Sequence, residues 1–259
     1  MTDDSKSCRF ASGPDNRIMT SPLSISRETA VGAEARLSWI LSGLAGMVGA
    51  VAFLHSAGYF VTFMTGNTER AVVGHFGHPE GKEVAPGASP WAALALMGSF
   101  LAGVVISSIC RRRYWSNHPH GATVLTTIAL AAAGAIDIAI SGWSSANVNF
   151  YPILLVAFAL GALNTAFTKK EETYIPLSYV TGTLVKLGQG IERHLFGGGT
   201  HYDWLCYTAL LGSFALGGVV GAFIGVVITG PQVLLLTALI SFGATIFTFT
   251  HTERNSLLG

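Results

Sequence analysis

Six long apolar stretches, separated by shorter polar segments, constrain the fold of this chain more than any other feature. They cover residues 37–64, 91–110, 122–141, 150–167, 204–228 and 232–250. An α-helix needs about 17–25 residues to cross a bilayer core of about 30 Å. Because backbone amides find no water in that core, each stretch is predicted to be helical. The sequence therefore predicts an all-α integral membrane protein with about six transmembrane helices.

The composition supports the same class and argues against several others. Only 11% of the residues are charged and 50% are hydrophobic, whereas soluble domains carry about 25% charged residues. Such a chain cannot cover its surface with polar side chains in water, so membrane lipid is its expected partner. The net charge of +1 argues against a nucleic acid partner. The three cysteines show no pairing that predicts a disulfide framework or a zinc site.

The polar segments predict the topology of the chain. Residues 1–36 are polar and mixed in charge, which predicts a disordered tail ahead of a membrane domain over residues 37–252. All 15 Lys and Arg residues except Arg70 and Lys82 fall on one side of the six predicted spans. Since basic residues concentrate on the cytoplasmic side, both termini are predicted to be cytoplasmic.

Two segments of the chain repeat each other. Residues Phe63–Thr68 match Tyr179–Leu184, and both contain a Thr-Gly pair. Further on, Gly98–Phe100 matches Gly212–Phe214. The matches predict one repeat over about residues 37–141 and a second over about 150–250. Each repeat holds three spans, so the second is expected to insert upside down, an arrangement that recurs in secondary transporters.

Small residues recur at four-residue spacing in the second and fifth spans. Four-residue spacing places them on one helix face, where they allow close helix contact. We expect the second and fifth spans to pack through these faces, and packing against each other across a pseudo-two-fold axis is one arrangement. The small residues are Ser99, Gly103 and Ser107 in the second span and Ser213, Gly217, Gly221 and Gly225 in the fifth.

The two Thr-Gly motifs are the main candidates for a substrate site. Glycine allows close backbone approach and can interrupt a helix, and such helix breaks bind substrates or ions near the midplane of transporters. The other interpretation is a pair of helix caps at the membrane interface, where Thr, Asn and Gly are also favoured. The candidate residues are Thr65, Gly66, Asn67, Thr181, Gly182 and Thr183.

Other polar residues near the spans have two interpretations each. Asn164 is a site residue or a link between helices, because an amide in lipid needs a partner. Asp137 is a site for substrate and proton coupling, or is solvated near the interface. Arg70 and Lys186 hold an anionic group, or extend to the interface. A metal cluster in the loop that carries His75, His78 and Glu80 is not expected.

These motifs resemble the YoaK-like family, a domain-of-unknown-function group of six-span membrane proteins. The resemblance rests on residues 46–53, 63–68, 161–167 and 179–188 and, with their spacing, covers about residues 37–252. It implies the fold and the membrane location. The family commonly has an acidic residue where this chain has Gly49, which implies altered or absent ion coupling here if that residue couples ions in relatives.

Together, these observations predict a transporter of a small molecule or ion, with a site between the two repeats. The alternative is a non-transporting membrane scaffold or lipid-binding protein, in which the small-residue faces serve helix assembly. A homo-oligomer is compatible with the sequence. The sequence contains no P-loop, no dinucleotide-binding fingerprint, no G-x-S-x-G nucleophile motif and no H-E-x-x-H metalloprotease motif. We therefore expect neither an enzyme nor a cofactor.

Overall fold

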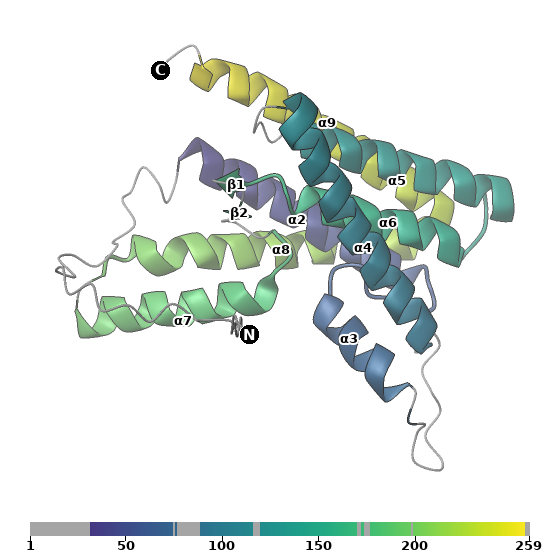
Figure 1. Ribbon diagram of the computed structural model, residues 1–259, viewed down its shortest axis with the longest axis horizontal. Helices are drawn as coiled ribbons and strands as arrows, with labels where there is room; N and C mark the ends of the chain where they lie inside the picture. Colours follow the sequence, from purple (N-terminus) through teal and green to yellow (C-terminus); the bar gives the residue numbers. More distant parts are fainter. Residues whose placement is uncertain are drawn as a thin grey trace, which may run out of the picture.

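The computed structural model of the protein describes residues 32–74, 76, 89–115, 120–169, 172–173, 177–197 and 199–256. Residues 1–31 of the predicted tail and the three loop residues considered for metal binding lie outside this part. The helices, shown in Figure 1, are α2 (Ala33–Leu54), α3 (Met64–Val73), α4 (Pro90–Cys110), a π-helical turn (Arg111–Trp115), α5 (His120–Ser141), α6 (Phe150–Leu163), α7 (Val180–Phe196), α8 (Tyr202–Val227) and α9 (Gly230–Ser256).

The predicted all-α membrane class is confirmed. In the described residues, the strands are β1 (Thr168–Lys169) and β2 (Glu172–Thr173), which form one antiparallel pair. Five helical segments in this part of the chain are long and apolar enough to cross a membrane: Glu34–Leu54, Pro90–Trp115, His120–Ser141, Tyr202–Val227 and Gly230–Thr250. Helix α6 is also apolar but has only 14 residues. Helices α3 and α7 are not among these spans.

The first apolar stretch is not one helix. Helix α2 ends at Leu54, and α3 begins only at Met64. Between them, Gly58 has a φ of 73°, a left-handed conformation that glycine adopts without steric cost and that does not continue a right-handed helix. The prediction of helix breaks at the Thr-Gly motifs is therefore corrected. The breaks come before the motifs, and Gly66 and Gly182 lie in the first turns of α3 and α7.

The long helices pack in crossed pairs. Helix α2 packs mainly against α8, and α4 packs against α6, while α5 contacts both α6 and α9. The two shorter helices flank this core, α3 beside α4 and α7 beside α8 (Figure 1). In the described residues α4 and α8, the predicted second and fifth spans, do not contact each other. The arrangement in which they pack together is therefore wrong, and each packs on the first helix of the other half.

Glycine brings the backbones of these crossed helices into contact. A β-carbon at Gly46 of α2 would overlap the carbonyl of Phe214 in α8, and one at Gly217 would overlap the carbonyl of Gly43. The other crossing has the same form: a β-carbon at Gly161 of α6 would overlap the Phe100 carbonyl of α4. The prediction that the small-residue faces form close helix contacts is thus confirmed, although their partners differ from the arrangement considered.

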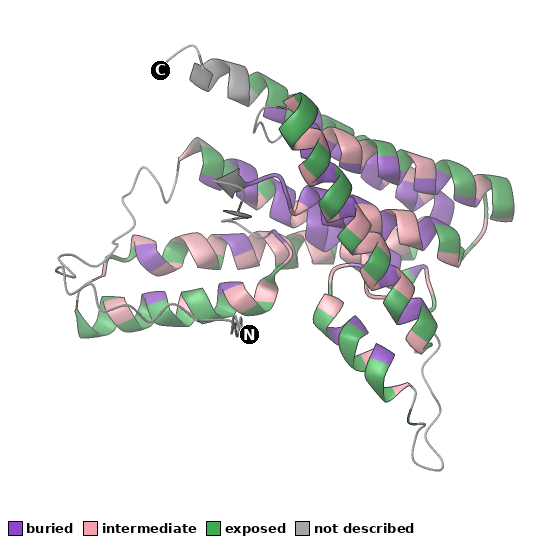
Figure 2. Ribbon diagram, in the orientation of Figure 1, coloured by how far each residue is buried: buried purple, intermediate pink, exposed green. Residues whose placement is uncertain are grey.

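The crossings enclose an apolar core. Figure 2 shows buried residues concentrated around α6 and the helices packed against it, whereas α3 and α7 are largely exposed. Ile153, Val156 and Leu160 of α6 are fully buried. Helix α6 is thus enclosed by its neighbours, and its two ends are fixed in position by the same packing.

Enlarging a glycine at a crossing should loosen the whole bundle. We expect Gly161→Ala to lower the free energy of unfolding by about 1–3 kcal/mol, the usual cost of overpacking, because the Phe100 carbonyl must move. Gly212→Ala is the matched control, since a β-carbon there meets nothing within 4 Å. Unfolding by SDS, followed by circular dichroism, measures the difference. Equal stability of the two variants would contradict this account of the crossing.

Candidate functional site

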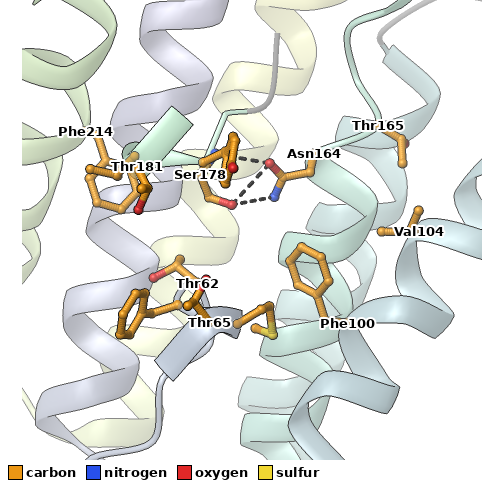
Figure 3. Close-up of a pocket in the computed structure, with 13 residues that line it drawn as sticks. Thr62, Thr65, Phe100, Val104, Asn164, Thr165, Ser178, Thr181 and Phe214 are labelled. Carbon is orange, nitrogen blue, oxygen red and sulfur yellow. Dashed lines mark hydrogen bonds between the residues drawn. The ribbon is translucent and has the colours of Figure 1, made fainter. Parts of the chain in front are cut away.

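A cavity of about 530 Å³ lies where α3 and α7 begin. Figure 3 shows Thr181, Ser178 and Asn164 on one side of it and Thr62 and Thr65 on the other. The polar lining residues are Thr62, Thr65, Asn164, Thr165, Ser178 and Thr181, and the apolar and aromatic ones are Phe63, Met64, Phe100, Val104, Tyr179, Val180 and Phe214. The cavity therefore combines hydroxyl groups with an aromatic wall, and residues from both halves contribute.

Two helix N-termini border this cavity. Helix α3 starts after Phe63 and α7 after Tyr179, and neither start has a side-chain cap. The first helical hydrogen bonds are donated by the Asn67 amide to the Phe63 carbonyl (3.2 Å) and by the Thr183 amide to the Tyr179 carbonyl (3.1 Å). The preceding amides of each first turn have no helical acceptor. Both helix starts thus offer N–H groups beside the cavity.

The glycine of each Thr-Gly motif makes room for an aromatic ring. A β-carbon at Gly66 would overlap the ring of Phe63, and one at Gly182 would overlap the ring of Tyr179. Each ring therefore folds back over the first turn of the helix that it precedes. Since Phe63 and Tyr179 both line the cavity, the two glycines shape its wall, and neither lines it directly.

The threonines of the motifs do line the cavity. Thr65 and Thr181 are exposed, and no described residue forms a hydrogen bond with either hydroxyl. The residues after the glycines point elsewhere. The buried Asn67 side chain donates to the Phe60 carbonyl (2.7 Å), and the Thr183 hydroxyl donates to the Tyr179 carbonyl (3.0 Å). Of the six motif residues, only Thr65 and Thr181 line the cavity.

Asn164 both lines the cavity and links two helices. Its Oδ1 accepts hydrogen bonds from the amide and the hydroxyl of Ser178, both at 3.1 Å. Its Nδ2 donates to the Leu160 carbonyl at 2.8 Å and lies at the same distance from the Ser178 hydroxyl. The side chain therefore ties the end of α6 to the start of α7. Its geometry is that of a link between helices, and its position on the cavity wall is compatible with a site residue.

The charged flanking residues lie outside the cavity lining. Arg70 donates to the Gly58 carbonyl (2.9 Å), and its guanidinium stacks over the Phe60 ring at 4.2 Å. It thereby holds the segment that connects α2 to α3. The Lys186 ammonium lies 5.8 Å from the centre of the Tyr207 ring. Neither side chain is among the residues around the cavity.

Asp137 lies at the other end of the core. Its Oδ1 accepts a hydrogen bond from the Asn149 amide (3.0 Å), just before α6, and one from the Ser141 hydroxyl (3.2 Å). Helix α6 has 14 residues, so its two ends are about 20 Å apart at 1.5 Å per residue. Asn164 and the cavity are at the far end. The structure thus does not bring Asp137 together with the other candidates.

Several residues in or beside the cavity were not predicted from the sequence. Arg111, at the end of α4, donates to the carbonyl of the cavity residue Thr165 at 2.6 Å, and nothing in the sequence indicates this long-range contact. Thr62 and Ser178 do have a sequence signal. Each is a hydroxyl residue directly before the aromatic residue of a Thr-Gly motif. In the described part of the chain, no group of three or more His, Cys, Asp or Glu side chains could hold a metal ion.

Comparison with known proteins gives a family match and one distant relative. A family model described as a protein of unknown function (DUF1275) matches residues 37–247. The UPF0700 transmembrane protein RA0705 of Rhizobium meliloti (strain 1021) is 30% identical over 183 residues, which cover 70% of this chain and 72% of the relative. No solved structure matches the chain.

If the cavity holds water, a cysteine in it should react with water-soluble methanethiosulfonate reagents. In a chain whose three cysteines are replaced by serine, we expect Thr181→Cys to react at least tenfold faster than Ile128→Cys, because a thiol must ionise to react. Ile128 is 59% exposed but sits on the apolar outer face of α5. Mass spectrometry of membrane vesicles measures both rates, and equal rates would mean that water does not enter the cavity.

Proposed function

Because the chain belongs to the DUF1275 family of proteins of unknown function, we propose its role from its own geometry: it is a membrane transporter that binds a small anion between the starts of α3 and α7. The observation that carries this proposal is the pair of uncapped helix N-termini that border one cavity. The resemblance to the YoaK-like family agrees with the DUF1275 match and is part of the proposal, as is the absence of enzyme activity.

The chemistry of the cavity favours an anion over a cation. A helix N-terminus carries the equivalent of about half a positive charge, and its free amides point toward a bound anion. The hydroxyls of Thr65 and Thr181 add two neutral donors. Among the described residues, no Asp or Glu side chain lines the cavity, and the Arg111 guanidinium lies one hydrogen bond away from it. The end of α6 also reaches the cavity at Asn164 and Thr165 and carries charge of the opposite sign. The Arg111 guanidinium, which donates to the Thr165 carbonyl there, offsets it.

The size of the effect is sufficient for selective binding. One helix N-terminus stabilises an anion by about 0.3–2 kcal/mol, so two such ends contribute about 0.6–4 kcal/mol. Since 1.4 kcal/mol corresponds to a tenfold change in affinity, this range equals about threefold to several hundredfold. Hydrogen bonds to a charged ligand are worth a further 1.5–3 kcal/mol each in typical proteins. These contributions offset part of the anion's dehydration on entering the cavity.

We further propose that the two halves are inverted repeats that open the cavity alternately to either side of the membrane. The two glycine crossings support this, because α2 crosses α8 in the same way that α6 crosses α4. Transporters of this kind place the site between two repeats. The proposed orientation, with both termini cytoplasmic, rests on the distribution of Lys and Arg, and a homo-oligomer is compatible with it.

A lipid-binding role is the second candidate, because a separate apolar groove exists. It has a volume of about 410 Å³ and lies between α2, α8 and α9, with Ile40, Met47, Val220 and Phe247 among its lining residues. Its lining is almost wholly apolar, which suits an acyl chain. The groove does not account for the hydroxyls and free amides at the starts of α3 and α7, so transport is the preferred function.

Proline substitutions test the proposed site directly. Met64 and Val180 are the first residues of α3 and α7, a position where proline is tolerated and removes only an N–H group that the helix does not use. The preceding residues, Phe63 and Tyr179, have ψ angles of 74° and 68°, outside the α region that a following proline disfavours. We expect Met64→Pro or Val180→Pro to weaken anion binding about tenfold or more.

The measurement is a thermal-shift titration of the purified protein at constant ionic strength. Sodium chloride, nitrate, formate, acetate, phosphate and sulfate are compared with sodium gluconate, and flux of the most stabilising anion into liposomes follows. A ligand of the folded state raises the melting temperature by mass action. Met64→Leu and Val180→Ile are the matched controls. If none of the six anions stabilises the protein beyond gluconate, or the prolines leave binding unchanged, the proposed function is wrong.

A further inference from the structure

Asn164 and Ser178 are linked in the second half of the chain. The corresponding positions in the first half are Gly49 and Thr62, and Gly49 has no side chain to form the link. Asn164 follows Gly161, the glycine of one helix crossing, by three residues, and Gly49 follows Gly46, the glycine of the other, by the same spacing. A β-carbon at Gly49 would lie 3.0 Å from Cγ2 and 3.1 Å from Oγ1 of Thr62. Position 49 therefore faces Thr62 as Asn164 faces Ser178.

The missing side chain leaves the two halves of the cavity unequal. The amide and hydroxyl of Ser178 are both bonded to Asn164. The hydroxyl of Thr62, on the opposite side of the same cavity, forms no hydrogen bond with any described residue. It is therefore available to donate to a ligand, together with the Thr65 hydroxyl and the amides at the start of α3.

We infer that Gly49 is a specificity-determining position of the cavity, and this inference rests on the proposed function. The lack of a side chain there keeps the Thr62 hydroxyl free as a donor and keeps the surface of the cavity without negative charge. A carboxylate at position 49 would lie beside Thr62, would accept its hydrogen bond, and would oppose an anion between the two helix starts. An amide at the same place would occupy Thr62 but would add no charge.

The comparison of Gly49→Asp with Gly49→Asn isolates the charge, because the two side chains have nearly the same shape. Gly49→Ala is the control for crowding against Thr62, which must move by a few tenths of an ångström to admit a β-carbon. Thr62→Asp and Thr62→Asn place the same carboxylate and amide at Thr62, the residue that faces position 49. If the variants at position 49 do not fold, this second pair still tests the inference, because equal results for Thr62→Asp and Thr62→Asn would overturn it.

The first readout is the electrical potential in the cavity, which does not depend on any ligand. Thr181→Cys is introduced into each variant in the cysteine-free chain, and its rates of modification by an anionic and a cationic methanethiosulfonate reagent are compared. We expect the ratio of anionic to cationic rate to fall at least tenfold in Gly49→Asp relative to Gly49→Asn. The Asn and Ala variants should stay within threefold of the parent chain.

The second readout is the affinity for the anion of the panel above that stabilises the protein most. We expect Gly49→Asp to bind it at least tenfold more weakly than Gly49→Asn. The inference is overturned if the Asp and Asn variants have the same rate ratio. If their ratios differ as expected but no anion stabilises the parent chain, position 49 controls the potential of the cavity, whereas the proposed anion transport and the anion specificity that rests on it are wrong.

Discussion

Close contact between helix backbones decides where the other parts of this molecule lie. Where α2 crosses α8 and α4 crosses α6, a glycine of one helix rests against a main-chain carbonyl of the other. Such contact is a main source of helix association in lipid, where apolar side chains gain little from leaving the lipid for each other. Because each crossing joins an early helix of one half to the second helix of the other, neither half forms the core alone.

The crossings also determine where the short helices begin. Helix α3 packs beside α4, and α7 packs beside α8, so the starts of both are carried to the same central region. A helix start leaves amides without acceptors, and such amides need water or a ligand as a partner. In the proposed function, a small anion in the cavity provides this partner, because it suits N–H and O–H donors.

Much of this could be predicted from the sequence, because lipid imposes strong patterns. Apolar length gave the membrane class, and small residues at four-residue spacing gave the helix faces in contact. The spacing describes one helix only, so it could not identify α6 as the partner of α4. The Thr-Gly motifs lie beside the cavity, but the long apolar run hid the break between Leu54 and Met64. Asp137 remains a predicted site residue that lies far from the cavity. Its bond to the Asn149 amide could not be predicted, because it depends on a turn that no local pattern encodes.

The most direct test of the central claim is to locate a bound anion. Bromide scatters X-rays anomalously, so crystals of the protein grown in sodium bromide would show its position without any assumption about transport. The account predicts an anomalous peak in the cavity, within hydrogen-bond distance of the first-turn amides of α3 and α7 and near the hydroxyls of Thr65 and Thr181. A cavity filled by a lipid or detergent chain, or one without bromide at saturating concentration, would contradict it.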